Sequence, residues 1–171
     1  MKCLSIKFIW MFIITSEDIN ILRKRGIIVE ENINALDEIS KGASMGIDAI
    51  SFVLDKVEDN DFKDLLEKQR DKYKNISEKI KSVYKKYNSE DKPHETNTMT
   101  KLMTWYGVEM KTLTNHSNSK IAELLIQGTD MGIIEGRKIY NNKKIDKEVL
   151  DIVNKFIEMQ ERSIEELKNY L

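Results

Sequence analysis

The sequence GASMGI at residues 42–47 decides the fold of this chain, because it returns as GTDMGI at residues 128–133. We call these two stretches the glycine boxes. The residues that recur at one constant offset are Gly42, Met45, Gly46 and Ile47 in the first box and Gly128, Met131, Gly132 and Ile133 in the second. Both boxes lie inside segments whose apolar residues are three and four positions apart, which is the spacing of an amphipathic helix.

Glycine inside a helix costs about 1 kcal/mol relative to alanine, so its repetition needs a physical reason. A missing side chain lets another helix, or a ligand, approach the backbone closely. We therefore predict that the boxes form either a helix-packing ridge, which we favour, or a ligand slot. In the first case Gly42 or Gly46 lies near Gly128 or Gly132.

The pattern around the boxes predicts two similar helical hairpins. The first hairpin covers residues 32–87, with Asn32 or Asn34 as its N-cap and a turn at residues 59–61. The second covers residues 119–171, with Asp146 capping its last helix. The connector at residues 88–118 holds the single proline and a short helical pattern. The sequence thus predicts an all-α, four-helix bundle in which a long crossover makes the second and third helices parallel.

Residues 1–28 do not share this pattern, and we interpret them as a leader preceding one bundle domain at residues 29–171. The uninterrupted apolar run at residues 8–14 is far shorter than the roughly 20 residues that a membrane-spanning helix needs. One hypothesis is that translation starts at Val29, since Arg25-Gly26 can be encoded as a ribosome-binding site. The alternative is that residues 3–15 are a real membrane anchor.

Two helical hairpins joined by a long crossover resemble the ferritin-like superfamily, and the glycine box resembles small bacterial members without an assigned role. The resemblance covers roughly residues 32–171. It implies a place for a di-metal centre, built in metal-binding relatives from one Glu on each of two helices and Glu-x-x-His on the other two. Here Glu67 is followed three residues later by Arg70, and Glu158 by Glu161.

The inward line of the second helix instead offers Gln69 and Tyr73, and that of the fourth offers Phe156 and Gln160. The side-chain amides of these two glutamines can form hydrogen bonds with each other, with a tyrosine hydroxyl or with water. We therefore expect no bound metal and no cofactor.

Other candidate sites are few, and none has the pattern of a catalytic group. A methionine- and aromatic-rich cluster in the connector predicts either core packing or a partner-binding surface. Three carboxylates on the third helix form the remaining candidate, an acidic site. The cluster contains Met103, Trp105, Tyr106 and Met110, and the carboxylates are Glu123, Asp130 and Glu135.

Composition limits the partners of the chain. Its 171 residues carry a net charge of −1, which gives no electrostatic reason to bind nucleic acid. A single cysteine excludes a disulfide framework and is compatible with the cytoplasm. We favour a non-catalytic interaction or assembly module that forms a homo-oligomer, with a further protein partner left open. The alternatives are a ferritin-like metal or redox protein that uses carboxylates alone and a carrier of a small apolar ligand.

Overall fold

A computed structural model describes residues 16–88, 116–142 and 144–171 of the chain. These residues form four α-helices and a final 3-10 turn, with no strand among them. The helices are α1 (Ser16–Leu54), α2 (Asn60–Tyr84), α4 (Asn118–Asn142) and α5 (Lys147–Leu167), followed by η3 (Lys168–Tyr170). The predicted all-α class and the four-helix bundle are confirmed.

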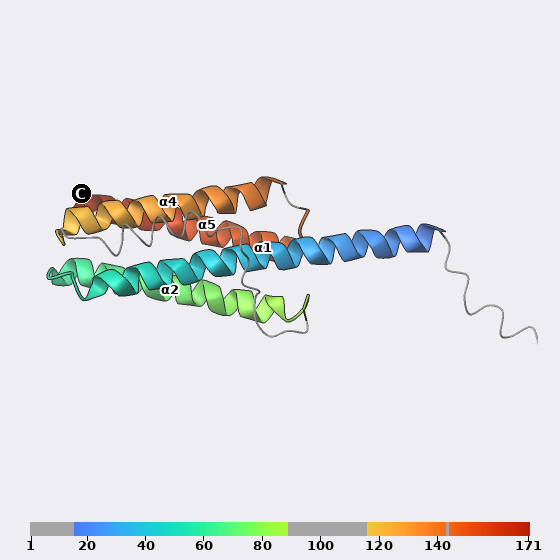
Figure 1. Cartoon of the computed structure of the whole chain (residues 1–171), viewed down its shortest axis with the longest axis horizontal. Helices are drawn as coiled ribbons and strands as arrows, with labels where there is room; N and C mark the ends of the chain where they lie inside the picture. Colours follow the sequence, from blue (N-terminus) through green and yellow to red (C-terminus); the bar gives the residue numbers. More distant parts are fainter. Residues whose placement is uncertain (1–15, 89–115, 143) are drawn as a thin grey trace, which may run out of the picture.

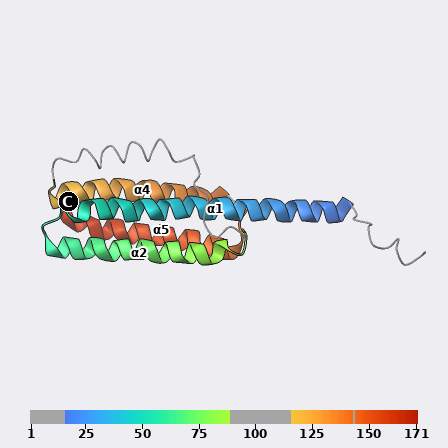
Figure 2. The same ribbon diagram turned by 60° about the horizontal axis from the view of Figure 1, so that its bottom comes forward.

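The helices form two antiparallel hairpins, α1–α2 and α4–α5, that lie side by side (Figures 1 and 2). Each helix makes its most extensive contacts with the partner in its own hairpin. Helices α2 and α4 run in the same direction, as predicted for a crossover that spans the length of the bundle. The short helix predicted in the connector lies outside the described residues.

The core is built from the apolar faces that the sequence spacing predicts. Phe62, Leu66 and Ile80 of α2 are fully buried, as are Val149 and Val153 of α5. The ring of Phe62 also stacks on Tyr170 of η3, with 4.2 Å between ring centroids, and so attaches the end of the chain to the start of α2.

Two aspartates stand at the start of the returning helices, but they act differently. Asp59 caps α2, its side chain accepting a hydrogen bond from the Phe62 backbone N–H at 2.9 Å. Asp146 occupies the same place before α5, yet its carboxylate makes no cap bond. It accepts from Asn32 Nδ2 and from the Tyr87 hydroxyl, each at 2.9 Å.

Asn32 therefore links α1 to the turn between α4 and α5. This asparagine is fully buried, and its side-chain oxygen also accepts from the Asp146 backbone N–H at 2.8 Å. Tyr87 brings the end of α2 to the same carboxylate. Burial and the negative charge of Asp146 raise the pKa of Tyr87 to about 12, so its hydroxyl keeps its proton at neutral pH.

The structure corrects the predicted start of the first helix, since α1 begins at Ser16 rather than at Asn32 or Asn34. Residues 16–31 contain no proline and mostly residues that tolerate a helix, so the helix continues towards the N-terminus. Asn32 lies inside it and bonds to Asp146 instead of capping.

We call residues 16–30 of α1 the overhang, because they extend beyond the other helices (Figure 1). At about 1.5 Å per residue the overhang is roughly 22 Å long. None of the helices that the structure describes is long and apolar enough to cross a membrane.

We expect Asn32→Ala to lower the free energy of unfolding by about 1–3 kcal/mol, because it removes two hydrogen bonds to Asp146 that contribute about 0.5–1.5 kcal/mol each. Urea denaturation followed by circular dichroism measures the loss. Asn20→Ala, on the exposed overhang of the same helix, is the control and should change stability by less than about 0.5 kcal/mol. Equal effects of the two substitutions would contradict the importance of the link.

Candidate functional site

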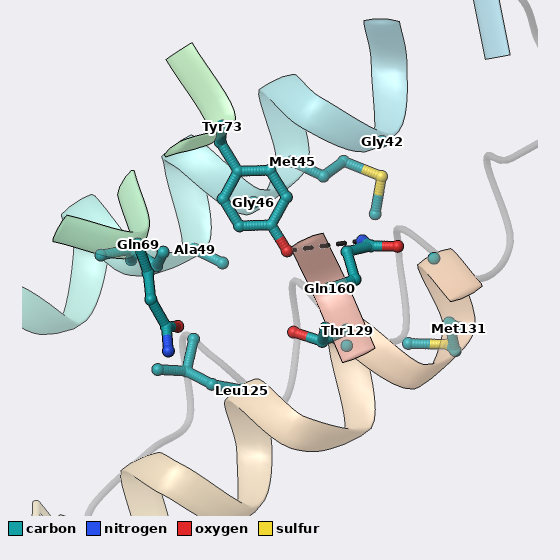
Figure 3. A pocket seen from close by; sticks show the side chains of 13 residues that line it. Gly42, Met45, Gly46, Ala49, Gln69, Tyr73, Leu125, Thr129, Met131 and Gln160 are labelled. Carbon is teal, nitrogen blue, oxygen red and sulfur yellow. Dashed lines mark hydrogen bonds between the residues drawn. The ribbon is translucent and has the colours of Figure 1, made fainter. Parts of the chain in front are cut away.

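The two glycine boxes lie on neighbouring helices, α1 and α4, and line one cavity in the middle of the bundle (Figure 3). The cavity has a volume of about 40 Å³ and receives side chains from all four helices. Its lining residues are Gly42, Met45, Gly46, Ala49, Ile50, Gln69, Tyr73, Leu125, Gly128, Thr129, Met131, Gly132 and Gln160. All six glycines and methionines named from the boxes are among them.

Gly46 makes room for a side chain of α2, and Gly132 makes room for a side chain of α5. A Cβ on Gly46 would lie 2.5 Å from the Tyr73 ring, and one on Gly132 would overlap the Gln160 amide. Real Cβ atoms essentially never approach other heavy atoms this closely. The first box therefore admits a tyrosine at the point where the second admits a glutamine.

The tyrosine and the glutamine meet across the cavity. Gln160 Nε2 donates a hydrogen bond to the Tyr73 hydroxyl at 3.4 Å, and Figure 3 shows the two side chains pointing toward each other. Burial raises the pKa of the Tyr73 hydroxyl, although hydrogen bonds from Gln160 and Thr129 partly offset this. The hydroxyl therefore stays neutral and is a poor general base.

The side-chain oxygen of Gln160 takes no part in this contact. Gln160 is 2% exposed, and its Oε1 has no hydrogen-bond partner among the described residues. A buried polar atom without a partner costs about 1–3 kcal/mol. It is therefore the polar group at this site that is most in need of an explanation.

A second glutamine closes the end of the cavity away from Gln160. Gln69 Nε2 donates to the Ser163 backbone carbonyl at 3.2 Å and to the Glu166 carboxylate at 3.0 Å. Lys72 forms an ion pair with the same carboxylate at 3.0 Å. These bonds join α2 to α5 and fix the Gln69 amide in the cavity wall.

The predicted acidic site does not assemble. Glu123 pairs with Lys120 at 2.8 Å and Glu135 with Lys138 at 2.6 Å, both within one turn of α4, while Asp130 is exposed. Ion pairs of this kind belong to solvated helix faces.

The predicted partner surface, Met103, Trp105, Tyr106 and Met110, lies outside the described residues, so its two interpretations stay open.

Sequence reasoning placed Gln69, Tyr73 and Gln160 inward, and all three are buried. It missed Thr129, which follows the first glycine of the second box, and Gly136, where a Cβ would lie 2.7 Å from Ile157. The run of glycines at 128, 132 and 136, each four residues apart, was the available signal.

Comparison with known families identifies the chain. A family model described as a domain of unknown function, DUF2383, matches residues 31–142, which is more than half of the sequence. The chain belongs to the DUF2383 family. The DUF2383 match begins where α1 enters the bundle and ends with α4. A search of curated proteins finds no match.

The fold of this DUF2383 protein is similar to that of a solved structure from Bacteroides fragilis. That protein is described as a dodecameric thioferritin and as bacterioferritin-related. The TM-score is 0.65 with 16% sequence identity, and the alignment covers 91% of this chain and 92% of that one. This likeness confirms the ferritin-like, four-helix fold.

The centre of the DUF2383 bundle does not fit the di-metal site that a ferritin-like fold implies. Its inward polar groups are two amides, a phenol and an alcohol, from Gln69, Gln160, Tyr73 and Thr129, and none of these is a carboxylate or imidazole. Iron, manganese and zinc prefer charged oxygen or imidazole ligands. No group of three or more His, Cys, Asp or Glu in the described part of the chain could hold a metal ion.

We expect Gly46→Ala to destabilise the bundle by about 1–3 kcal/mol, because the Tyr73 ring must move to admit the methyl group. Gly132→Ala should also destabilise, through loss of the Gln160–Tyr73 bond. Thermal unfolding measures both. Gly26→Ala is the matched control, since a Cβ there meets nothing within 4 Å and helix propensity favours alanine. A melting temperature that rises in all three variants would contradict this account.

We also expect no stoichiometric iron, manganese or zinc in the purified protein, because its inward donors are uncharged. Elemental analysis after purification without an affinity tag measures this. About two metal ions per chain, lost in Glu123→Ala or Glu135→Ala, would contradict the expectation and support a carboxylate-only metalloprotein.

Proposed function

We propose that this protein is a non-catalytic assembly module that forms a homo-oligomer through the overhang of α1. The observation that carries the proposal is the exposure of apolar side chains there. Of the nine large apolar side chains exposed on the described residues, five lie in this one segment. They are Ile21, Leu22, Ile27, Ile28 and Val29, with 37% to 58% of each exposed. Such clusters on a soluble bundle mark interaction surfaces.

Four of these residues continue the core-facing side of α1. Residues seven apart lie almost above one another on a helix, so Leu22 and Val29 lead to the buried Leu36. Ile21 and Ile28 lead in the same way to the buried Ala35. The bundle covers this side of α1 from about residue 31 onward, and the overhang presents the same side to solvent.

The occupant that we propose is a second copy of the chain. The overhang carries Glu17 near its tip and Arg23, Lys24 and Arg25 in its middle, so an antiparallel arrangement of two overhangs brings opposite charges closer together than a parallel one.

Other exposed apolar residues offer a weaker surface. Phe52 carries the Lys56 ammonium 3.6 Å from its ring centroid, so its face is already covered by a cation–π contact. Ile134 and Tyr140 are single exposed residues of a common kind. The dodecameric assembly of the Bacteroides fragilis protein supports a homo-oligomer as a property compatible with this fold. We expect the assembly to form in the cytoplasm.

We expect the full-length protein to be oligomeric and the double variant Leu22→Lys/Val29→Lys to dissociate into smaller species, because charge is placed in the apolar side. Analytical ultracentrifugation measures the masses. Ile27→Lys is the control: Ile27 is 54% exposed but lies on the line of Asn20 and Asn34, away from Leu22. A monomeric wild type, or equal disruption by Ile27→Lys, would overturn the proposal. Helicity by circular dichroism should be the same in all variants.

A further inference from the structure

The cavity between the glycine boxes is larger than one water needs. A single water takes up about 10–15 Å³ of such space, whereas this cavity offers about 40 Å³. Most of its wall is apolar, formed by the box glycines, Met45, Met131 and Leu125. Its polar groups converge from Tyr73, Thr129 and Gln160 (Figure 3). An apolar wall with a few convergent polar groups is the usual composition of a small-molecule site, and this cavity has that composition on the scale of about three heavy atoms.

The unpartnered oxygen of Gln160 points to the chemistry of the occupant. The amide has two polar ends, and its nitrogen already bonds the Tyr73 hydroxyl. Its oxygen is buried and accepts nothing from the described residues, and Gln160 is one of the residues that line the cavity. A molecule with an O–H or N–H donor would give this oxygen a hydrogen bond, whereas a purely apolar molecule would leave it without a partner.

The charge of the lining residues narrows the class of molecule that the cavity can bind. Among the described residues that line the cavity, none carries a formal charge. A cation or anion placed here would lose its hydration without meeting an opposite charge. The half-buried Met45 and Met131 have flexible side chains that can adapt to a range of apolar shapes.

We propose that the cavity binds a small uncharged molecule that has a hydroxyl group and a short apolar part. Its hydroxyl donates to Gln160 Oε1, and its apolar part lies between Met45 and Met131. This site is independent of the overhang and of the assembly proposed above. It also refines the hypothesis that the protein carries a small apolar ligand, because the ligand needs one polar end to bond Gln160.

Two isomers provide a sharp test on the full-length protein. Ethanol and dimethyl ether have the same atoms, but only the alcohol can donate a hydrogen bond. Each has three heavy atoms, which is the number that about 40 Å³ can hold at about 10–15 Å³ for each water-sized group. We expect saturable shifts of the Met45 and Met131 methyl signals in ¹³C-methionine NMR titrations. The alcohol should bind about three- to tenfold more tightly, the range expected for one hydrogen bond. Absence of a saturable shift would mean that the cavity holds water only and would overturn the proposal, as would equal or tighter binding of the ether.

A variant tests the role of Gln160 itself. Gln160→Met keeps a similar length and removes the amide, so the preference for the alcohol should disappear while the ether still binds. Gln127→Met is the matched control on the exposed face of α4 and should keep the preference. Retention of the preference in Gln160→Met would overturn the assignment of this residue. If that variant does not fold, the comparison of the two isomers on the wild type decides the proposal.

Discussion

The middle of the bundle depends on the absence of side chains at Gly46 and Gly132. Tyr73 and Gln160 occupy the space where a Cβ would lie, so the two hairpins close around their large polar side chains. Each glycine costs about 1 kcal/mol of helix stability. Burial of an aromatic ring beside the first glycine offsets that cost, since a buried tyrosine removes on the order of 150–250 Å² from water. The glycine boxes therefore provide space for side chains of neighbouring helices.

The two hairpins have the same arrangement of helices and glycines, but different side chains fill the space at those glycines. Gly46 receives Tyr73 from its own hairpin, and Gly132 receives Gln160 from its own hairpin. Gly42 differs, because Phe156 of the other hairpin approaches its Cβ position to 3.0 Å. The repeat thus sets where space is left. The residue that fills each space decides whether the centre is aromatic, polar or hollow.

Most of the fold could be predicted from the sequence, because helix spacing and capping are local signals. The turn before α2 follows from the Asp59 cap, and Asp146 occupies the predicted N-cap position of α5 although its side chain makes no cap bond. The start of α1 could not be predicted in this way, since Asn32 has the chemistry of a cap but bonds a residue 114 positions away. Gly136 was hidden for a related reason: the repeat aligns it with Ile50, so comparison of the two copies gave it no glycine counterpart.

The polar centre also fixes how the hairpins meet. Gln69 bonds the Ser163 carbonyl and Gln160 bonds the Tyr73 hydroxyl, so both contacts join α2 to α5 and therefore cross between hairpins. Apolar residues of similar size would remove the cost of burying these amides, but they would not supply directional bonds between the two hairpins. Directional bonds select one register. A bundle of this kind gives up some stability for a defined centre, and that defined centre fixes the Gln160 amide beside the cavity.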